Sequence, residues 1–141
     1  MMPSGFRDLE VWKRAHGAVL EVYRVTNSFP RNEQFGVTSQ LRRAAYSIPA
    51  NMAEGFGRRT TKELLQSLAV ANGSLEEMRY FLLLSRDLRY LAPEQFDKME
   101  KELKAIAQML AALVRSLKNR LSLSERDTGH GTRVTNLKAR S

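Results

Sequence analysis

Apolar residues recur every three or four positions along four stretches of this chain, which is the spacing of one face of an α-helix. The first stretch covers residues 8–27, and residues 28–30 end it because Pro30 disfavours a helical conformation at the residue before it. The second stretch covers residues 33–56, and we expect it to stop at Gly57 in a left-handed conformation. The chain therefore begins with two predicted helices and a short connection.

The third stretch begins at Thr60, where Thr60 and Glu63 have the spacing of a capping box, and extends to about residue 90. It crosses Asn72-Gly73, a dipeptide typical of turns, without a change in the phase of its apolar positions. We therefore expect one uninterrupted helix, in which Gly73 and Ser74 let a neighbouring backbone come close.

The fourth stretch opens at Pro93, a favourable first position of a helix, and keeps its apolar spacing to Leu117. Four helices with short links predict an all-α fold, an antiparallel up-down-up-down four-helix bundle formed by residues 1–121. Residues 122–141 lack periodicity and are polar and basic, so we expect a disordered tail.

Composition agrees with a single domain, since 141 residues with 43% hydrophobic side chains are enough to bury one core. No run of about 18 apolar residues occurs and the first residues carry no signal-peptide pattern, so we expect no membrane association. The absence of cysteine excludes disulfides and thiolate chemistry, and the expected location is the cytoplasm. The net charge of +8 favours an anionic partner, although residues 115–141 hold five of those excess charges.

The second predicted helix carries a polar stripe beside its apolar face, and Pro49 interrupts its middle. The stripe consists of Gln40, Arg43, Ser47, Asn51, Glu54 and Arg58. One interpretation is a solvated flank of an amphipathic helix. The other is a hydrogen-bonded network, partly buried at a subunit boundary, in which Glu54 pairs with Arg43 or Arg58, or with Ser74 and Glu77 of the third helix. Because Ser47 and Asn51 are poor helix formers, the network is favoured.

The remaining face of the same helix is small and apolar where an exposed face normally carries Lys and Glu. Its residues are Arg42, Tyr46, Pro49, Ala50, Ala53 and Gly57. A second copy of the chain would cover such a face, and we therefore predict a homo-oligomer. The alternative is chance, because alanine is the best helix former.

Basic side chains are frequent near the junction of the second and third helices and in the last turns of the fourth. They are Arg42, Arg43, Arg58, Arg59, Lys62, Arg115, Lys118 and Arg120. In a symmetric oligomer such a patch would form a basic ring that binds nucleic-acid phosphates, with Tyr46, Phe56 and Tyr90 available for base stacking. A solvated basic rim without function is the alternative.

Catalytic chemistry is not indicated. His16 and His130 are the two histidines, and neither has a carboxylate and a nucleophile at a recognisable spacing. The Glu-x-x-His pairs of di-metal bundles are also missing. We therefore expect no enzyme activity, no catalytic residue, no cofactor and no metal site.

Three strings carry a resemblance to a known family: LEVWKRA, FPRNEQFGVTSQLRRAAYSIPANMAEGFGR and ELLQSLAVANGSLEE. Over roughly residues 6–117 the chain resembles the bacterial four-helix-bundle family of 23S rRNA intervening-sequence proteins. Relatives of that family are the accessory variability determinant proteins of diversity-generating retroelements. The resemblance implies a homopentamer with a central channel. The accessory relatives are thought to bind nucleic acid and a partner reverse transcriptase, but they lack most of SIPANMAEGFGR, so the chain is closer to the broad group.

The sequence thus predicts a non-enzymatic homo-oligomeric bundle that binds RNA or DNA without sequence specificity. A structural or protein-partner scaffold, for example a reverse-transcriptase accessory, is the alternative from a different class. A third reading is a small-molecule site inside the channel. Salt dependence separates the first two, because phosphate contacts make affinity fall steeply with salt.

Overall fold

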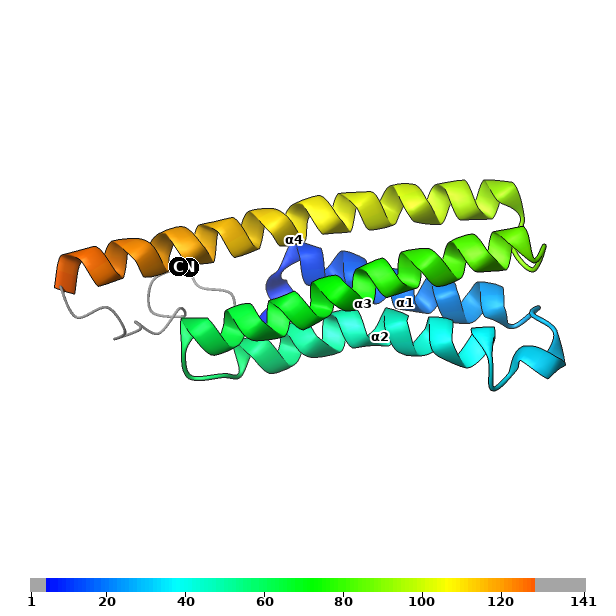
Figure 1. Cartoon of the computed structure of the whole chain (residues 1–141), viewed down its shortest axis with the longest axis horizontal. Coiled ribbons are helices and arrows are strands. Elements are labelled where there is room, and N and C mark those ends of the chain that lie inside the picture. Colours follow the sequence, from blue (N-terminus) through cyan, green and yellow to red (C-terminus); the bar gives the residue numbers. More distant parts are fainter. Residues whose placement is uncertain (1–4, 129–141) are drawn as a thin grey trace.

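Four long helices dominate the computed structural model, which describes residues 5–128. The elements are η1 (Phe6–Asp8), α1 (Glu10–Thr26), η2 (Arg31–Glu33), α2 (Val37–Phe56), α3 (Thr61–Asp87) and α4 (Pro93–Thr128), where η denotes a 3-10 helix. Successive helices run in opposite directions, with α2 beside α3 and α4 along α3 (Figure 1). No strand occurs within residues 5–128. The predicted all-α antiparallel four-helix bundle is confirmed.

The core is built from the apolar positions of all four helices. Because these positions recur every three or four residues, each helix turns one continuous stripe inward. The largest fully buried side chains are Val22, Leu41, Ile48, Met52, Leu68, Leu75, Met78, Leu82, Leu103, Ile106, Leu110 and Leu117. Burial of each such side chain contributes roughly 1.5–3 kcal/mol relative to exposure. Hydrophobic burial therefore holds the four helices together.

The N-terminus of α3 has the capping box that the sequence predicts. The Thr60 side chain accepts a hydrogen bond from the backbone N–H of Glu63 at 3.1 Å, and the Glu63 carboxylate accepts one from the backbone N–H of Thr60 at 3.3 Å. The helix then passes through Asn72 and Gly73 without a break, as predicted. It ends at Asp87, three residues before the predicted end.

The expected close approach of a backbone at Gly73 is wrong within this chain, because a Cβ built there would meet no atom within 4 Å. The close approach occurs instead at Gly55 of α2. A Cβ at Gly55 would lie 2.8 Å from Ser67 Cβ and 2.9 Å from Leu64 Cδ1 of α3. Gly73 lies on the exposed side of α3, whereas Gly55 is buried against that helix.

The left-handed stop predicted at Gly57 is also wrong. Gly57 has φ −88° and ψ −6°, because its N–H still bonds to the carbonyl of Glu54 in a helical manner. The left-handed residue follows α3 instead, where Arg89 has φ 66°. Its N–H bonds to the Arg86 carbonyl, and the N–H groups of the next two residues bond to the Ser85 carbonyl, so both of these carbonyls at the end of α3 are satisfied.

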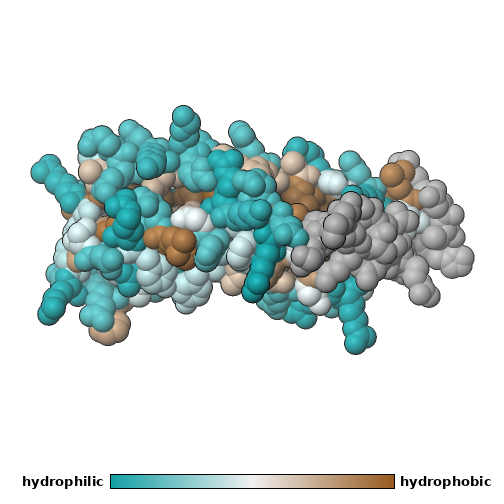
Figure 2. All heavy atoms as spheres, turned by 180° about the vertical axis from the view of Figure 1, so that it is seen from behind, coloured by the Kyte–Doolittle hydropathy of each residue, from teal (hydrophilic) through white to brown (hydrophobic). Residues whose placement is uncertain are grey.

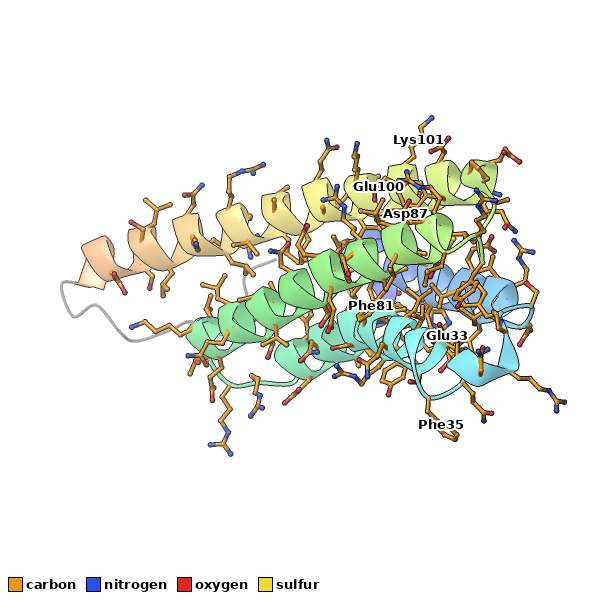
Figure 3. The ribbon with its side chains drawn as sticks, turned by 45° about the vertical axis from the view of Figure 1, so that its right-hand side comes forward. Glu33, Phe35, Phe81, Asp87, Glu100 and Lys101 are labelled. Carbon is orange, nitrogen blue, oxygen red and sulfur yellow. The ribbon has the colours of Figure 1, made fainter. Side chains whose placement is uncertain are left out.

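The connection before α2 is longer than predicted, since α2 begins at Val37 rather than residue 33. Glu33 explains the shift. Its carboxylate accepts a hydrogen bond from the N–H of Val37 at 3.2 Å and another from the hydroxyl of Tyr90 at 2.7 Å. Glu33 therefore caps α2 from outside the helix and links it to the segment after α3. Phe35, which lies between Glu33 and Val37 in sequence, projects away from the bundle and is 88% exposed (Figure 3).

Helix α4 continues to Thr128, past residue 121 where the apolar pattern predicts the bundle to end. After Pro93 no glycine or proline occurs before Gly129, and extending a formed helix needs no new nucleus. Figure 1 shows α4 reaching beyond the ends of α2 and α3. The remaining tail, residues 129–141, lies outside the described residues, so its expected disorder stays a prediction.

Candidate nucleic-acid interface

Six of the eight candidate basic residues lie at one end of the bundle, which we call the basic end: Arg58, Arg59, Lys62, Arg115, Lys118 and Arg120. The register follows from Arg79 of α3, which pairs with Glu100 of α4 at 3.0 Å. Because the two helices are antiparallel, counting seventeen residues back along α3 and seventeen residues forward along α4 places Lys62 level with Leu117. Figure 1 shows the α2–α3 connection at the end past which α4 projects.

Within the part of the chain that the structure describes, most cations of the basic end have no side-chain partner. Arg58 forms an ion pair with Glu54 at 2.5 Å. The others make no side-chain hydrogen bond or ion pair to any residue in the described part of the chain, and Arg59 and Lys62 are exposed. Glu63, the acid nearest to them in α3, serves in the capping box. The unpaired cations therefore give this end a positive field toward solvent.

Arg42 and Arg43 lie apart from that end, so the cluster of five predicted at the α2–α3 junction does not form. Arg42 lies about 21 Å from Phe56, the last residue of α2, at 1.5 Å per residue, and Arg58 follows Phe56. Arg42 donates a hydrogen bond to the hydroxyl of Thr26 at 2.8 Å and stacks over the ring of Tyr23 at 4.6 Å. It therefore joins α1 to α2 and is not free for phosphate. Arg43 lies 3.7 Å from Glu77 of α3.

None of the three aromatic residues considered for base stacking presents an exposed ring at the basic end. Phe56 is half-buried against the core. Tyr90 packs on Phe29 with ring centroids 5.6 Å apart and donates its hydroxyl to Glu33. Tyr46 is 47% exposed but lies one turn from Arg42, in the other half of α2. The basic end thus offers cations without an adjacent exposed ring among these three.

The polar stripe of α2 faces α3 of the same chain. The hydroxyls of Ser47 and Ser74 share a hydrogen bond of 2.8 Å. The amide of Asn51 donates to the carbonyl and the hydroxyl of Ser47, at 2.7 and 2.9 Å. Gln40 accepts a weak bond from Arg43 at 3.4 Å. These contacts explain why two poor helix formers occupy the middle of α2, since both are satisfied locally.

A small polar cavity of about 290 Å³ continues this stripe toward the basic end. Its lining includes Asn51 and Glu54 of α2, Arg58 of the α2–α3 connection, and Gln66 and Ser67 of α3. Hydrogen-bond donors and acceptors are therefore available beside the basic end. No group of three or more His, Cys, Asp or Glu side chains able to hold a metal occurs in residues 5–128.

Similarity to known proteins decides the family. The model of the 23S rRNA-intervening sequence protein family matches residues 7–112. The chain belongs to this family. It is also similar to the crystal structure of a protein of unknown function from the S23 ribosomal protein family of Bacteroides thetaiotaomicron, with a TM-score of 0.69 and 19% identity. That match covers 74% of this chain and 95% of the other, and it shows the fold alone. No curated protein matches.

In this member of the intervening-sequence family, part of the face expected to meet another copy is covered by its own α1. Pro49 is buried, and its carbonyl accepts a hydrogen bond from the indole N–H of Trp12 at 3.1 Å. Proline at this position has no N–H, so the carbonyl of Ala45, one turn earlier, lacks its usual donor. Ala53 is half-buried, whereas Tyr46, Ala50 and Gly57 stay exposed.

Sequence reasoning missed the ion pairs that attach α4 to the intervening-sequence fold. Arg14 of α1 binds Glu102 through two hydrogen bonds of 2.6 and 2.9 Å. Arg79 of α3 binds Glu100 in the same two-bond manner, at 3.0 and 3.2 Å. The hydrogen bond and the charge of Arg14 lower the pKa of Glu102. No local signal identifies partners 88 residues apart.

His16 is exposed in α1 and stacks on Trp12, with ring centroids 5.2 Å apart. His130 lies outside the described residues. No helix found within residues 5–128 is long and apolar enough to cross a membrane.

Proposed function

We propose that this chain forms a non-enzymatic homo-oligomer, a pentamer, that binds RNA or DNA without sequence specificity through its basic end. The observation that carries the proposal is the convergence of Arg59 and Lys62 with Arg115, Lys118 and Arg120, which lie more than fifty residues away in sequence. Folding gathers cations from the α2–α3 connection, α3 and α4 onto one surface, and such a surface attracts polyanions.

The character of the basic end favours the phosphate backbone over the bases. Lys and Arg on flexible stems contact phosphates in many geometries, and such contacts carry no sequence information. The three candidate aromatic rings are occupied or distant, which argues against stacking as the main source of affinity. Binding that is weak, nonspecific and sensitive to salt is therefore expected.

The outer faces of α2 and α3 support self-association. On α3, Val70 is 54% exposed and Tyr80 is 57% exposed, and the bare backbone of Gly73 lies between them in sequence. On α2, Tyr46 and Ala50 are exposed. Apolar side chains gathered over two neighbouring helices are typical of surfaces that contact another protein. A closed ring would repeat the basic end around its axis and raise the avidity for a polyanion.

The same apolar surface favours the second candidate function, a scaffold for a protein partner such as a reverse transcriptase, without nucleic-acid binding of its own. The two functions differ in which surface is necessary. The first requires the cations of the basic end, whereas the second requires only the α2 and α3 faces.

The decisive experiment measures fluorescence anisotropy of a labelled single-stranded RNA of mixed sequence as salt is increased. We expect the slope of log K against log salt to fall by about 0.7 for each phosphate contact removed. The test variant carries Arg59→Gln, Lys62→Gln and Lys118→Gln. The control removes equal charge from the opposite end, with Arg31→Gln, Arg89→Gln and Lys98→Gln. A third variant replaces the three basic residues of the tail: Arg133, Lys138 and Arg140.

Binding that weakens only in the first variant supports the proposal. Equal losses in the first variant and the control would show diffuse attraction by net charge, and loss only in the third would assign binding to the tail. Absence of binding in low salt would favour the scaffold. Light scattering on the same samples gives the mass, and a monomer would refute the oligomer.

A further inference from the structure

A slot lies between α1 and α4, in the half of the bundle away from the basic end. It opens because the residues that face each other are small: Gly17 and Ala18 on α1 and Ala105 on α4. A Cβ built on Gly17 would meet no atom within 4 Å. Figure 2 shows the back of the molecule, where brown apolar patches lie among teal side chains. The slot holds about 480 Å³, within the usual range for small-molecule sites.

The inner wall of the slot is apolar and adaptable. Met78 of α3 and Met99 and Leu103 of α4 lie at its base, and at most 5% of each is exposed, so these side chains must shift slightly for an apolar guest to contact them. Methionine side chains are flexible and polarisable, so they adjust to the shape of an apolar guest. Along each helix the lining spans eight residues, about 10 Å. This length suits a medium-length hydrocarbon chain.

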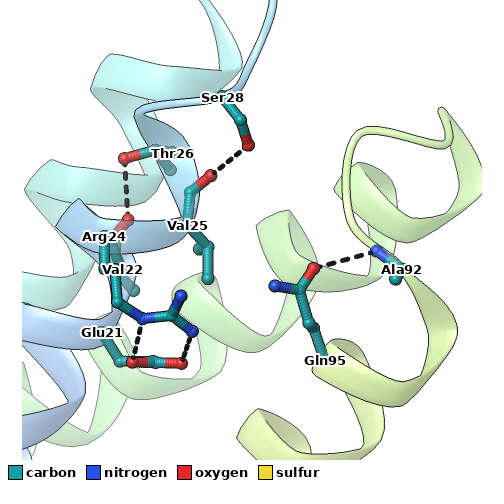
Figure 4. A network of polar contacts seen from close by, with 8 residues as sticks. All are labelled: Glu21, Val22, Arg24, Val25, Thr26, Ser28, Ala92 and Gln95. Carbon is teal, nitrogen blue, oxygen red and sulfur yellow. Dashed lines mark hydrogen bonds and ion pairs between the residues drawn. The ribbon is translucent and has the colours of Figure 1, made fainter.

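The rim of the slot has an excess of positive charge. Glu102 is bound by Arg14, and Glu21 is bound by Arg24 through two hydrogen bonds (Figure 4). Each rim carboxylate thus already has a cation of its own. Lys98 and Lys101 also line the slot and form no ion pair within the described residues. Lys101 projects from α4 toward solvent (Figure 3), where its long stem leaves the ammonium free to move.

We propose that this slot binds a small amphipathic anion, with a medium-length hydrocarbon chain against Met78, Met99 and Leu103 and its carboxylate beside Lys98. Lys101 supplies a second, mobile ammonium group. Charge complementarity selects this occupant, because Glu102 and Glu21 are each hydrogen-bonded to an arginine, and Lys98 and Lys101 add two further positive charges to the slot lining, Lys98 also acting on Glu21 through its charge. The site lies in the opposite half of the bundle from the proposed nucleic-acid surface and does not depend on it.

The test is a calorimetric titration of the full chain with sodium decanoate below its micellar concentration. We expect saturable binding in the native chain and none in Gly17→Leu, whose side chain fills the slot. Gly17→Leu enters open space and removes a helix-interior glycine, so we expect it to fold at least as well as the native chain. The matched control is Ala111→Leu, an exposed small residue in the interior of α4 outside the slot lining, and it should bind decanoate like the native chain.

A second arm tests the charged end of the ligand. We expect Lys98→Gln with Lys101→Gln to weaken decanoate about two- to fivefold, the effect of exposed ion pairs. Lys104→Gln, an exposed lysine of α4 outside the slot lining, is the control and should not change the affinity. An uncharged amphiphile with the same chain should bind more weakly than decanoate and should not respond to the lysine substitutions.

The proposal is overturned if decanoate does not saturate, if Gly17→Leu binds it as the native chain does, or if the uncharged amphiphile binds equally well. It is also overturned if Gly17→Leu lowers the oligomer mass in light scattering while decanoate fails to bind the native chain, because the slot would then be a contact between copies.

Discussion

The α2–α3 side and the α1–α4 side of this bundle use small residues with opposite results. Gly55 on α2 lies where Ser67 and Leu64 of α3 leave no room for a side chain, so the two helices pack closely. Gly17 on α1 faces open space, and α4 is attached there by the Arg14–Glu102 ion pair. A glycine thus marks close packing only where atoms of the neighbouring helix occupy the space that a side chain would fill.

The largest effect is expected where the two sides share the core. Leu75 of α3 is fully buried, so Leu75→Ala should destabilise the fold by about 2–5 kcal/mol, through lost burial and the cavity left behind. Leu20→Ala on α1 is the matched control, because Leu20 is 59% exposed, and it should change stability by less than about 0.5 kcal/mol. Urea unfolding measures both. Similar losses would mean that Leu20 is covered in solution.

The two glycines provide the next test. Gly55→Ala places a Cβ within 3 Å of two α3 atoms and should destabilise by about 1–3 kcal/mol through overpacking. Gly17→Ala should stabilise by about 0.5–1 kcal/mol, because alanine is the better helix former and nothing obstructs it. Thermal unfolding of the two variants measures the sign of each change in Tm. Two shifts in the same direction would contradict the difference between the two sides.

A smaller effect is expected from the polar stripe. A double-mutant cycle of Ser47→Ala and Ser74→Ala should give a coupling of about 0.5–1.5 kcal/mol, the usual net value of one hydrogen bond. Asn51→Ala should cost less in a Ser47→Ala background, because the Ser47 hydroxyl that Asn51 contacts is then absent. Additive losses across the cycle would show that the two hydroxyls do not interact in solution.

The smallest effect concerns pH. Hydrogen bonds from arginine lower the pKa of Glu102 and of Glu21 from the ordinary value of 4.5. A carboxylate whose folded pKa is lowered stabilises the fold above its unfolded pKa, and this contribution is lost as the pH falls through the folded pKa. Acidification below pH 4.5 should therefore reduce Tm, by no more than about 3 °C for Glu102, because Arg14 and Glu102 are exposed enough for water to screen them.

The variant for this measurement is Glu102→Gln, which should flatten the fall in Tm between about pH 5 and pH 3. Glu94→Gln provides the control, since Glu94 is exposed at the start of α4 and forms no ion pair within the described residues. An identical acid response in Glu102→Gln and the native chain would show that the Arg14 pair does not contribute.

The sequence predicted those features of the fold that depend on neighbouring residues. The capping box of Thr60 and Glu63, the start of α4 at Pro93 and the continuity of α3 through Gly73 all follow from local spacing. The left-handed residue at Arg89 was missed, because glycine is the usual choice there and Arg89 carries no such mark.

Features that depend on the rotation of one helix against another were not predictable. A helical projection of α2 placed Pro49 and Arg42 on one outer face, but it could not show that α1 covers both of them. The same limit applies to the glycines, since spacing alone cannot say that Gly55 and not Gly73 meets a neighbour. For the candidate interface, the sequence supplied the basic residues, and only the antiparallel register of α3 and α4 brought six of them together.

The link from Tyr90 through Glu33 to Val37 has a consequence for the order in which the protein opens. It ties the segment before α2 to the segment after α3, so the two helices and their flanking residues form a closed loop of contacts. Helices α1 and α4 join this loop from outside. We therefore expect α2 and α3 to exchange their amide hydrogens last and as one cooperative unit, with α1 and α4 detaching earlier. Native-state hydrogen exchange would refute this order if α4 proved the slowest element to exchange. Tyr90→Phe should make the amide exchange rates of the four helices more alike.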